Sequence, residues 1–594
     1  MAKKAKAAVD ILDELGALAD GGAPKITPDA IEKPMDRDYR ELITDLEYRL
    51  WGLKTTRSNY QTVWADLADY VSPSLGAHIQ RKDQNQQGFL KASKILDNTA
   101  FEKLRTLAAG MLGGMSSPTK PWFRLAMPDM IQDDNSVKVW LSDVEQRIRA
   151  VMDGGKFYEA LTLAYMDLGL FGTAAMLIYA DEKTTISCRP LPVGQYYFEA
   201  DDKGEITGLY REMSLTLYQL VRAYGVEALP AQLQLDYESK RGFDISYTVF
   251  QAIQPNKDFN PYVKGKDLNE YSDIHWLDGR HEGRLLSYKG FREKPFCAPR
   301  WHVPAGGSYG TSSPAWEALA DIKQLQDTTA FKLQAVAKNI SPPLIAHEMF
   351  KNQPAAFMPK GIMFSGNLNE IYAKPLYEAR IDITPLQMDI QDLRQRINQV
   401  FFGDLWLLLA NMEGIQPRSN LEIIERKGEK ILQLSPIVQK IQSELLKPAI
   451  ERIFLILHRE GKLPPMPPAI QQMSGEEIKI EYVNELAVAQ NAKDTVPIEQ
   501  FVAFLGNMAA ARPDVLDKLN GDEAIDLYSR ALGVNPKMVV DTDEANAVRD
   551  ARAQQQQQMA MMQQGLAAAQ GAKTLSETEV GGGVNALSRM MGVA

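Results

Sequence analysis

The chain has 594 residues, 45% of them hydrophobic, and a formal charge of −10 from 66 Lys and Arg against 76 Asp and Glu. Length and composition exclude a small stapled fold and wholesale disorder, and they indicate about four compact units. The negative charge argues against tight, sequence-reading DNA binding, because such proteins neutralise phosphates with a surplus of basic residues.

The first 38 residues hold no aromatic side chain and carry several Gly and Pro residues. A segment of that composition cannot bury enough apolar surface to order itself, so we predict a flexible N-terminal arm over 1–38. Apolar residues then recur at helical spacing over 39–70, and Pro73 ends the pattern. Further helices are predicted over 93–111, 136–152 and 156–171. Short strands are predicted at 175–179, 196–199 and 206–210, so a helical layer covers a small antiparallel sheet.

A β-rich insertion is predicted between two helical segments. Residues 216–237 have helical periodicity, whereas Phe243–Ile253 alternates and is rich in β-branched and aromatic residues. Strand patterning continues to Val303, and a helix with one apolar stripe follows from Pro314 to Ile340. At ~1.5 Å per residue, that helix is about 40 Å long.

The C-terminal half is predicted to be mainly helical, with a hairpin over 361–375 and a helix over 386–409. Pro436 and Pro448 interrupt a later apolar periodicity, so we expect a kink or a break at each of them. No aromatic residue follows Tyr528, and the Ala, Gln and Met bias of 546–594 predicts a tail that orders only in an assembly. The predicted fold class is therefore mainly α with small β-sheets (α+β).

No motif in the sequence carries catalytic or cofactor chemistry. The Gly-Lys pairs lack the upstream glycine of a Walker A loop, and the six histidines show no metal-ligand spacing. Two cysteines, Cys188 and Cys297, are too few for a disulfide framework or a Cys-based zinc site. We predict no catalytic residue, no cofactor and no metal site. No apolar run approaches the ~20 residues of a membrane span.

Charged residues follow the predicted helix over 314–340. Its lysines, at mainly helical spacing, are interleaved with acidic residues: Lys323, Lys332, Lys338, Glu317, Asp321 and Asp327. In a monomer this pattern is a solvated face. In a ring of subunits each lysine becomes a ring of charge, and a mostly acidic wall with sparse cationic rings passes DNA without holding it.

Six blocks of the sequence are informative when taken together and in order. They are Arg57–Pro73, Leu96–Leu125, Phe157–Ile178, Pro192–Thr216, Gly306–Gln326 and Arg426–Leu457. In this order the blocks resemble the portal proteins, or head-to-tail connectors, of short-tailed, podovirus-type bacteriophages, over roughly 40–530. One departure is Ser419-Asn420-Leu421-Glu422, where family members often have a Thr-Ala-Glu-Val type helix start. The capping chemistry of that start is preserved.

The resemblance implies a ring of twelve subunits at one capsid vertex, each with a wing, an α-helical stem, a β-containing clip and a helical crown. Mapped onto this chain, the wing takes 39–213 and 341–480, and a tunnel loop lies at about 377–386. The stem takes 214–240 and 306–340, the clip 241–305 and the crown 481–545. The tail over 546–594 either extends the crown or is disordered.

The resemblance also implies the function and the partners. The ring is then the channel for viral DNA packaging and ejection, in a virion assembled in the host cytoplasm. Implied partners are the terminase large subunit, tail adaptor and nozzle proteins, major capsid and scaffolding proteins, and double-stranded DNA bound without sequence preference. The candidate channel residues are Glu317, Asp321, Lys323, Lys332, Lys338 and Arg380. The candidate docking residues lie in the predicted clip and include Lys257, Lys264 and Lys266.

Two alternatives stay open from the residues alone. One is a DNA-processing or hydrolytic enzyme whose site has no recognised motif. The other is a capsid or tail structural protein without a channel. A ring with a central hole favours the portal hypothesis over both.

Overall fold

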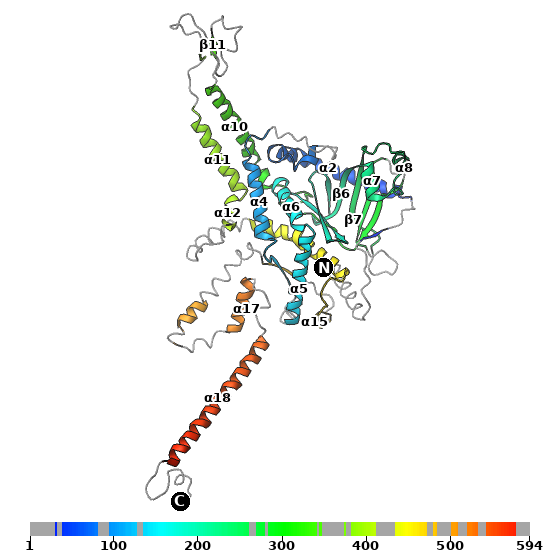
Figure 1. Cartoon of the computed structure of the whole chain (residues 1–594). Helices are drawn as coiled ribbons and strands as arrows, with labels where there is room; N and C mark the ends of the chain where they lie inside the picture. The colour runs from blue at the N-terminus through cyan, green and yellow to red at the C-terminus, as the bar shows by residue number, and fades with distance from the viewer. Residues whose placement is uncertain are drawn as a thin grey trace, which may run out of the picture.

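The computed structural model describes residues 30–32, 38–80, 94–127, 135–259, 269–279, 283–340, 344–346, 373–375, 382–410, 434–471, 479–483, 501–508, 512, 520–532 and 542–577. In this part of the chain the fold is mainly α with small antiparallel sheets, as predicted. Figure 1 shows a body of helices and sheets, from which one pair of helices projects at the top and the last helix projects below.

The helical layer of the body contains α2 (Arg40–Tyr70), α3 (Ala77–Gln80), α4 (Thr99–Met115), α5 (Asn135–Gly154) and α6 (Phe157–Phe171). The predicted helices over 39–70, 136–152 and 156–171 are confirmed. The helix predicted over 93–111 instead begins at Thr99 and continues through Gly113 to Met115.

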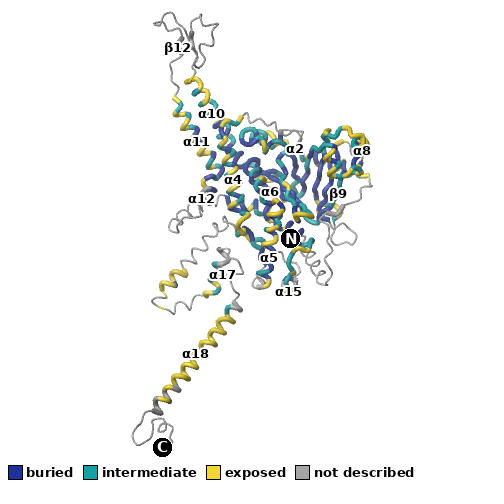
Figure 2. Tube along the Cα trace, in the orientation of Figure 1, coloured by how far each residue is buried: buried dark blue, intermediate teal, exposed yellow. Residues whose placement is uncertain are grey.

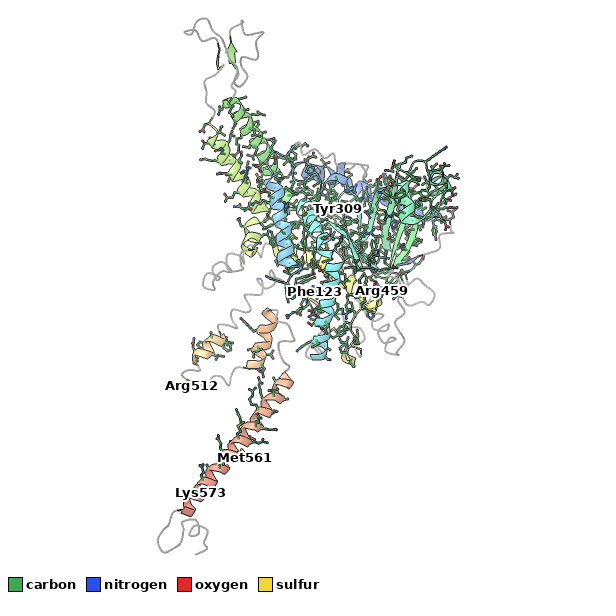
Figure 3. The ribbon with its side chains drawn as sticks, in the orientation of Figure 1. Phe123, Tyr309, Arg459, Arg512, Met561 and Lys573 are labelled. Carbon is green, nitrogen blue, oxygen red and sulfur yellow. The ribbon has the colours of Figure 1, made fainter. Side chains whose placement is uncertain are left out.

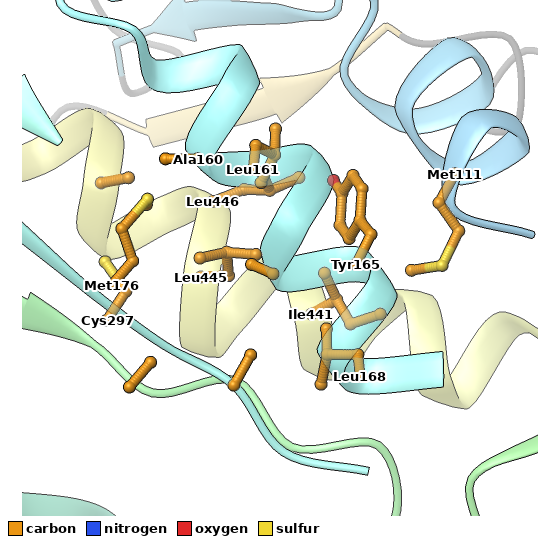
Figure 4. Close-up of a cluster of buried hydrophobic side chains, with 14 of the residues drawn as sticks. Met111, Ala160, Leu161, Tyr165, Leu168, Met176, Cys297, Ile441, Leu445 and Leu446 are labelled. Atoms are coloured by element: carbon orange, nitrogen blue, oxygen red, sulfur yellow. The ribbon is translucent and has the colours of Figure 1, made fainter. Parts of the chain in front are cut away.

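Helix α6 lies at the centre of the main hydrophobic core. Its residues are apolar on most sides, which is typical of a helix that is buried rather than amphipathic. Figure 4 shows Leu161, Tyr165 and Leu168 of α6 packed among side chains from other elements, including Met111 of α4 and Ile441. The helix ends where Gly172 takes a φ of +78°, a left-handed conformation that favours glycine.

A six-stranded antiparallel sheet packs beside this layer, in the order β1-β9-β8-β7-β6-β5. Its strands are β1 (Ala30–Glu32), β5 (Tyr196–Ala200), β6 (Ile206–Thr216), β7 (Ser246–Pro255), β8 (Tyr271–Leu277) and β9 (Ser287–Phe291). The predicted hairpin of β5 and β6 is confirmed. Ile43, Leu46 and Leu50 of α2 share a core cluster with side chains of this sheet, so the N-terminal half of α2 covers it.

The structure contradicts the predicted stem helix over 214–240. Two helices of eight residues occupy this segment, α7 (Leu217–Tyr224) and α8 (Ala231–Glu238). Gly225, with a φ of +84°, ends α7, and Pro230 immediately precedes α8. The helical periodicity of the segment is real, but these two residues interrupt it.

The strands of the predicted clip, 241–305, are not a separate insertion. Strand β7 pairs with β6 from Leu209↔Ile253 to Thr216↔Ser246, and β8 and β9 continue the same sheet. Alternation along the sequence predicts a strand, but it does not say which sheet the strand joins. These strands therefore belong to the body.

Three smaller sheets complete the described β-structure. The first has the order β10-β3-β4 and contains β3 (Ala175–Asp181), β4 (Thr185–Leu191) and β10 (Phe296–Cys297). The second pairs β2 (Phe123–Ala126) with β13 (Lys479–Tyr482). The third pairs β11 (Leu344–Ala346) with β12 (Ala373–Pro375). Of the hairpin predicted over 361–375, only β12 lies in the described residues.

Residues 434–459 form one helical segment whose middle, Gln442–Leu446, is a π-helix labelled η4, followed by α14 (Lys447–Arg459). The π-helical turn ends at Leu446, two residues before Pro448, which lacks the backbone N–H that an α-helix needs there. The predicted interruption at Pro448 is thus a local widening of the helix, whereas the one predicted at Pro436 is wrong, because 434–441 is α-helical throughout. Glu444 in this turn accepts hydrogen bonds from Arg300 at 2.6 and 3.3 Å.

The C-terminal region contains α15 (Pro468–Gln471), a helix at 501–508, α17 (Gly521–Leu532) and α18 (Thr542–Glu577). The tail predicted over 546–594 is helical as far as Glu577. Of the predicted N-terminal arm, residues 30–32 form β1, which pairs with β9. The capping box at 419–422 and residues 377–381 of the predicted tunnel loop lie outside the described residues.

Candidate functional site: a projecting helical hairpin

The helix pair that projects from the body is formed by α10 (Leu319–Ile340) and α11 (Thr384–Val400). The turn before it, α9 (Pro314–Glu317), starts where the Ser313 side chain accepts a hydrogen bond from the backbone N–H of Trp316. The Asp382 carboxylate accepts one from the N–H of Thr384 at 2.9 Å. Ser313 is therefore the side-chain cap of α9, whereas Ile383, the N-cap of α11, makes no capping hydrogen bond with its side chain. Figure 1 shows α10 and α11 lying antiparallel, and we call them the helical hairpin.

The base of the helical hairpin is fixed to the start of α4. The Gln326 side-chain oxygen accepts hydrogen bonds from the backbone N–H groups of Leu96 and Asp97 at 2.7 and 2.8 Å. Its amide donates to the Asp97 carbonyl at 2.9 Å. Gln326 is 3% exposed, so its side-chain amide supplies the hydrogen bonds that these buried backbone groups cannot make with water.

An ion pair on α11 secures the same place. Arg394 donates to one oxygen of the Asp97 carboxylate at 2.6 and 3.1 Å. Burial alone raises the pKa of Asp97, but hydrogen bonds from Thr99 and Arg394 outweigh it and lower the pKa below its usual value. The Asp97 carboxylate therefore stays ionised and joins α4 to α11.

The structure places two predicted channel residues in ion pairs at this base. Lys323 lies 2.7 Å from the Asp66 carboxylate of α2, and its ammonium lies 5.3 Å from the centre of the Tyr70 ring. Asp321 lies 3.3 Å from Arg396 of α11. These charges are largely compensated within one chain, so they contribute less to the field along the helix than the sequence pattern suggested.

The other predicted residues lie in different places. Glu317 is exposed at the end of α9, Lys332 is half-buried, and Lys338 is exposed near the far end of α10. Lys257, predicted as a docking residue, is exposed after β7 and lies 3.9 Å from Asp45. Arg380, Lys264 and Lys266 lie outside the described residues.

Large apolar side chains are exposed on the outer half of the helical hairpin. Phe331 is 61% exposed, Leu333 52% and Ile340 77%, and Met388 of α11 is 65% exposed. Positions 331 and 333 are about 200° apart around a helix, so these two side chains leave α10 on opposite sides. Figure 2 shows the projecting helices mostly in the colours of exposed and intermediate residues. A single partner on one side cannot cover both side chains.

Sequence reasoning missed the residues that hold the helical hairpin in place. Gln326, Arg394 and Arg396 act on groups that are distant along the chain, and periodicity carries no signal of such pairing. Leu333 and Ile340 belong to the apolar stripe predicted over 314–340, but Phe331 does not, and Met388 lies on a different helix.

Nothing described here has the form of a metal site or a membrane span. Among the described residues, no three His, Cys, Asp or Glu side chains are grouped so that they could hold a metal ion. Within the same residues, no helix is both long and apolar enough to cross a bilayer.

One buried chain of polar groups has the residue types of a proton relay. The Tyr224 hydroxyl lies 2.7 Å from Nδ1 of His275, and Nε2 of His275 lies 3.1 Å from the Asp273 carboxylate. Gln251 also donates to Asp273 at 2.9 Å. These bonds tie α7 to β7 and β8, which is a structural role.

A family model and two relatives agree on one family. The sequence pattern described as "Bacteriophage head to tail connecting protein" matches residues 44–539. The chain is 34% identical over 535 residues to a portal protein of Salmonella phage epsilon15, covering 89% of this chain and 95% of that protein. It is 34% identical over 528 residues to a probable portal protein of Bordetella phage BPP-1, covering 87% and 92%. A solved structure titled "Neck of empty GTA particle computed with C6 symmetry" matches with a TM-score of 0.33 and 12% identity, covering 73% of this chain and 94% of that one.

Proposed function

Since this chain belongs to the bacteriophage head-to-tail connecting protein family, we propose that copies of it close into a ring at one capsid vertex, as the channel through which viral DNA enters and leaves. Twelve subunits is the number that we propose. The protein is a component of the virion, and its role is structural. No bond is made or broken by the ring in this function.

One observation carries the proposal beyond the family match. The helical hairpin exposes Phe331 and Leu333 on opposite sides of α10. In a closed ring with head-to-tail contacts, every subunit has two different neighbours, one on each side. Such a ring covers both side chains, whereas a twofold dimer covers one surface only. We therefore assign the stem to α10 and α11, in place of 214–240.

The clip follows from this reassignment. The chain that joins α10 to α11 runs from 341 to 383 and includes the paired strands β11 and β12. We propose the paired strands β11 and β12 as the docking end for the terminase large subunit during packaging and for tail adaptor and nozzle proteins afterwards. We assign the wing to the body, and we propose that this part faces the major capsid and scaffolding proteins.

The charges of the helical hairpin favour the passage of DNA over tight binding of DNA. Lys323 is paired with Asp66 and Asp321 with Arg396, so the base of the helical hairpin presents little net charge. Glu317 and Lys338 are exposed and would form one anionic and one cationic ring in a closed assembly. With a formal charge of −10 per subunit, we expect double-stranded DNA to pass without tight binding.

Native mass spectrometry and negative-stain imaging of the purified full chain test the proposal. The expected mass is an integer multiple of 66.4 kDa, with twelve as the proposed number, and the images should show a ring with a central hole. A monomer at micromolar concentration, or a closed assembly without a hole, would overturn it. Nuclease or ATPase activity in a monomeric sample would favour the enzyme alternative.

A further inference from the structure

Helix α2 carries an uncharged stripe on its outer side. Five exposed residues share an arc of about 60° at 3.6 residues per turn, and no charged residue lies in that arc between positions 44 and 62: Thr44, Tyr48, Trp51, Thr55 and Thr62. We call this set the α2 stripe. Tyr48 is 74% exposed and Trp51 is 71% exposed, and these are the two most exposed aromatic side chains among the described residues.

The opposite side of α2 is fixed to the body. The rings of Tyr60 and Trp64 lie 5.3 and 5.4 Å from the ring of Tyr309, which is labelled in Figure 3. Arg57 donates to the Gly194 carbonyl at 2.7 Å. These contacts hold the helix in one orientation, so α2 cannot rotate to bury the α2 stripe against the body.

The α2 stripe can be covered at little cost to its hydroxyl groups. The Thr44 hydroxyl donates to the Arg40 carbonyl at 2.8 Å, and the Thr55 hydroxyl donates to the Trp51 carbonyl at 3.1 Å. A hydroxyl that is bonded to its own helix keeps that partner when another surface replaces water. The stripe residues are spaced by four, three, four and seven positions, which is the spacing of a helix–helix contact. The α2 stripe therefore fits the apolar face of another helix.

The sequence before β1 contains such a face. Placed on a helix, the large apolar residues between positions 10 and 20 fall within an arc of about 120°: Ile11, Leu12, Leu15 and Leu18. The acidic residues of the same stretch fall on the opposite side: Asp10, Asp13, Glu14 and Asp20. An amphipathic segment of this kind needs a second surface to cover its apolar side. Residues 9–20 lie outside the described residues.

The chain enters the described structure within reach of α2. Ala30, the first residue of β1, pairs with β9 at the edge of the six-stranded sheet. The middle of α2 lies over β6, where Lys54 pairs with Glu212 at 2.9 Å. Strands β1 and β6 are four strand spacings apart, which is about 19 Å. Residues 21–29 span up to about 30 Å when extended, so residues 9–20 have enough tether to reach their own α2.

We propose that residues 9–20 pack as an amphipathic helix on the α2 stripe of the same chain. A short tether gives the segment a high effective concentration at its own α2, which favours this occupant over a segment from another molecule. Ile11, Leu15 and Leu18 repeat the spacing of four and three residues found in the α2 stripe. The inference concerns a single chain and does not depend on the proposed ring.

Disulfide trapping in the purified full-length protein tests the proposal. The test variant combines Leu15→Cys with Thr55→Cys. The matched control combines Asp13→Cys with Thr55→Cys, which has nearly the same tether but places the cysteine on the acidic side of the segment. Cys297 is buried and Cys188 is partly buried, so the native cysteines give little background. After mild oxidation, mass spectrometry of a tryptic digest measures the linked peptide, and a non-reducing denaturing gel separates links within a chain from links between chains.

We expect a link within one chain, at several times the yield of the Asp13→Cys control. Equal yields in the two variants would overturn the proposal. A link that forms only between chains would overturn it as well, because the occupant would then be a second copy. In the test variant, Trp51→Ser should lower the yield several-fold, whereas Tyr218→Ser on α7, at a residue that is 54% exposed, should leave it unchanged. An unchanged yield with Trp51→Ser would also contradict the proposal. Whether the same samples form rings bears on the proposed function alone.

Discussion

Removing one exposed aromatic side chain from the helical hairpin should weaken ring assembly without weakening the fold. The change is Phe331→Ala on α10. Because Phe331 is 61% exposed in the single chain, its side chain contributes little to the stability of the subunit. The Phe331 side chain contributes to stability only when a neighbouring subunit covers it. The free energy of unfolding of the isolated subunit should therefore change by less than about 0.5 kcal/mol, as at other exposed positions.

The size of the assembly effect follows from the exposed area. A Phe side chain has roughly 200 Å² of accessible surface. At 61% exposure, about 120 Å² of the Phe331 surface is available for burial by a neighbouring subunit. At ~25 cal/mol per Å², covering that area stabilises each contact by about 3 kcal/mol. The alanine side chain still buries part of this area in the contact. We therefore expect Phe331→Ala to lose about 2.5 kcal/mol of association free energy per contact, or roughly a 70-fold weaker association.

Mass photometry over a concentration series measures this effect as the fraction of protein in rings. Thermal unfolding checks the fold of each variant. The matched control is Leu235→Ala on α8, which is 59% exposed and lies at the opposite end of the body from the helical hairpin in Figure 1. The reasoning is refuted if Phe331→Ala forms rings at the wild-type concentration, or if Leu235→Ala loses them equally.

Three further predictions concern the body. Gly110→Ala on α4 should destabilise by about 1–3 kcal/mol, because a Cβ there lies 2.4 Å from the ring of Trp406; Gly113→Ala, with nothing within 4 Å, should leave the melting temperature unchanged or raise it. Glu293→Gln should cost about 3–5 kcal/mol in urea titrations, since it leaves two buried arginines without their carboxylate. Burial raises the pKa of Glu293, but its arginine partners lower the pKa by more than burial raises it. The wild type should therefore lose this stability as the pH falls through the depressed pKa. Burial raises the pKa of Asp167 well above its usual value, so ionisation opposes folding; Asp167→Asn should become more stabilising, relative to wild type, as the pH rises from 4 to 8 in the same titrations, and an equal effect at both pH values would contradict this.

Local signals in the sequence predicted the helices of the body well. The apolar spacing of α2 and the nearly uninterrupted apolar composition of α6 are properties of the segments themselves, and both helices form where they were expected. Gly225 and Pro230 also carried a local signal, since both interrupt helices. The stem prediction over 214–240 gave more weight to periodicity than to these two residues.

Contacts between distant segments could not be predicted in this way. The sequence of strand β7 is compatible with a separate clip and with the sheet of the body, because its alternation does not identify the neighbouring strand. Lys323 and Asp66 are 257 residues apart in the chain, and Arg394 and Asp97 are 297 apart. Their pairing depends on how α10 and α11 pack on the body, so the charges of the candidate site had to be placed by the structure.

A cryo-electron microscopy reconstruction of the assembled full chain tests the central claim most directly. The account predicts a closed ring in which α10 and α11 surround an axial hole, with Phe331 and Leu333 each covered by a different neighbouring subunit. A ring whose hole is lined by other elements, with the helical hairpin free at its outer edge, would contradict it.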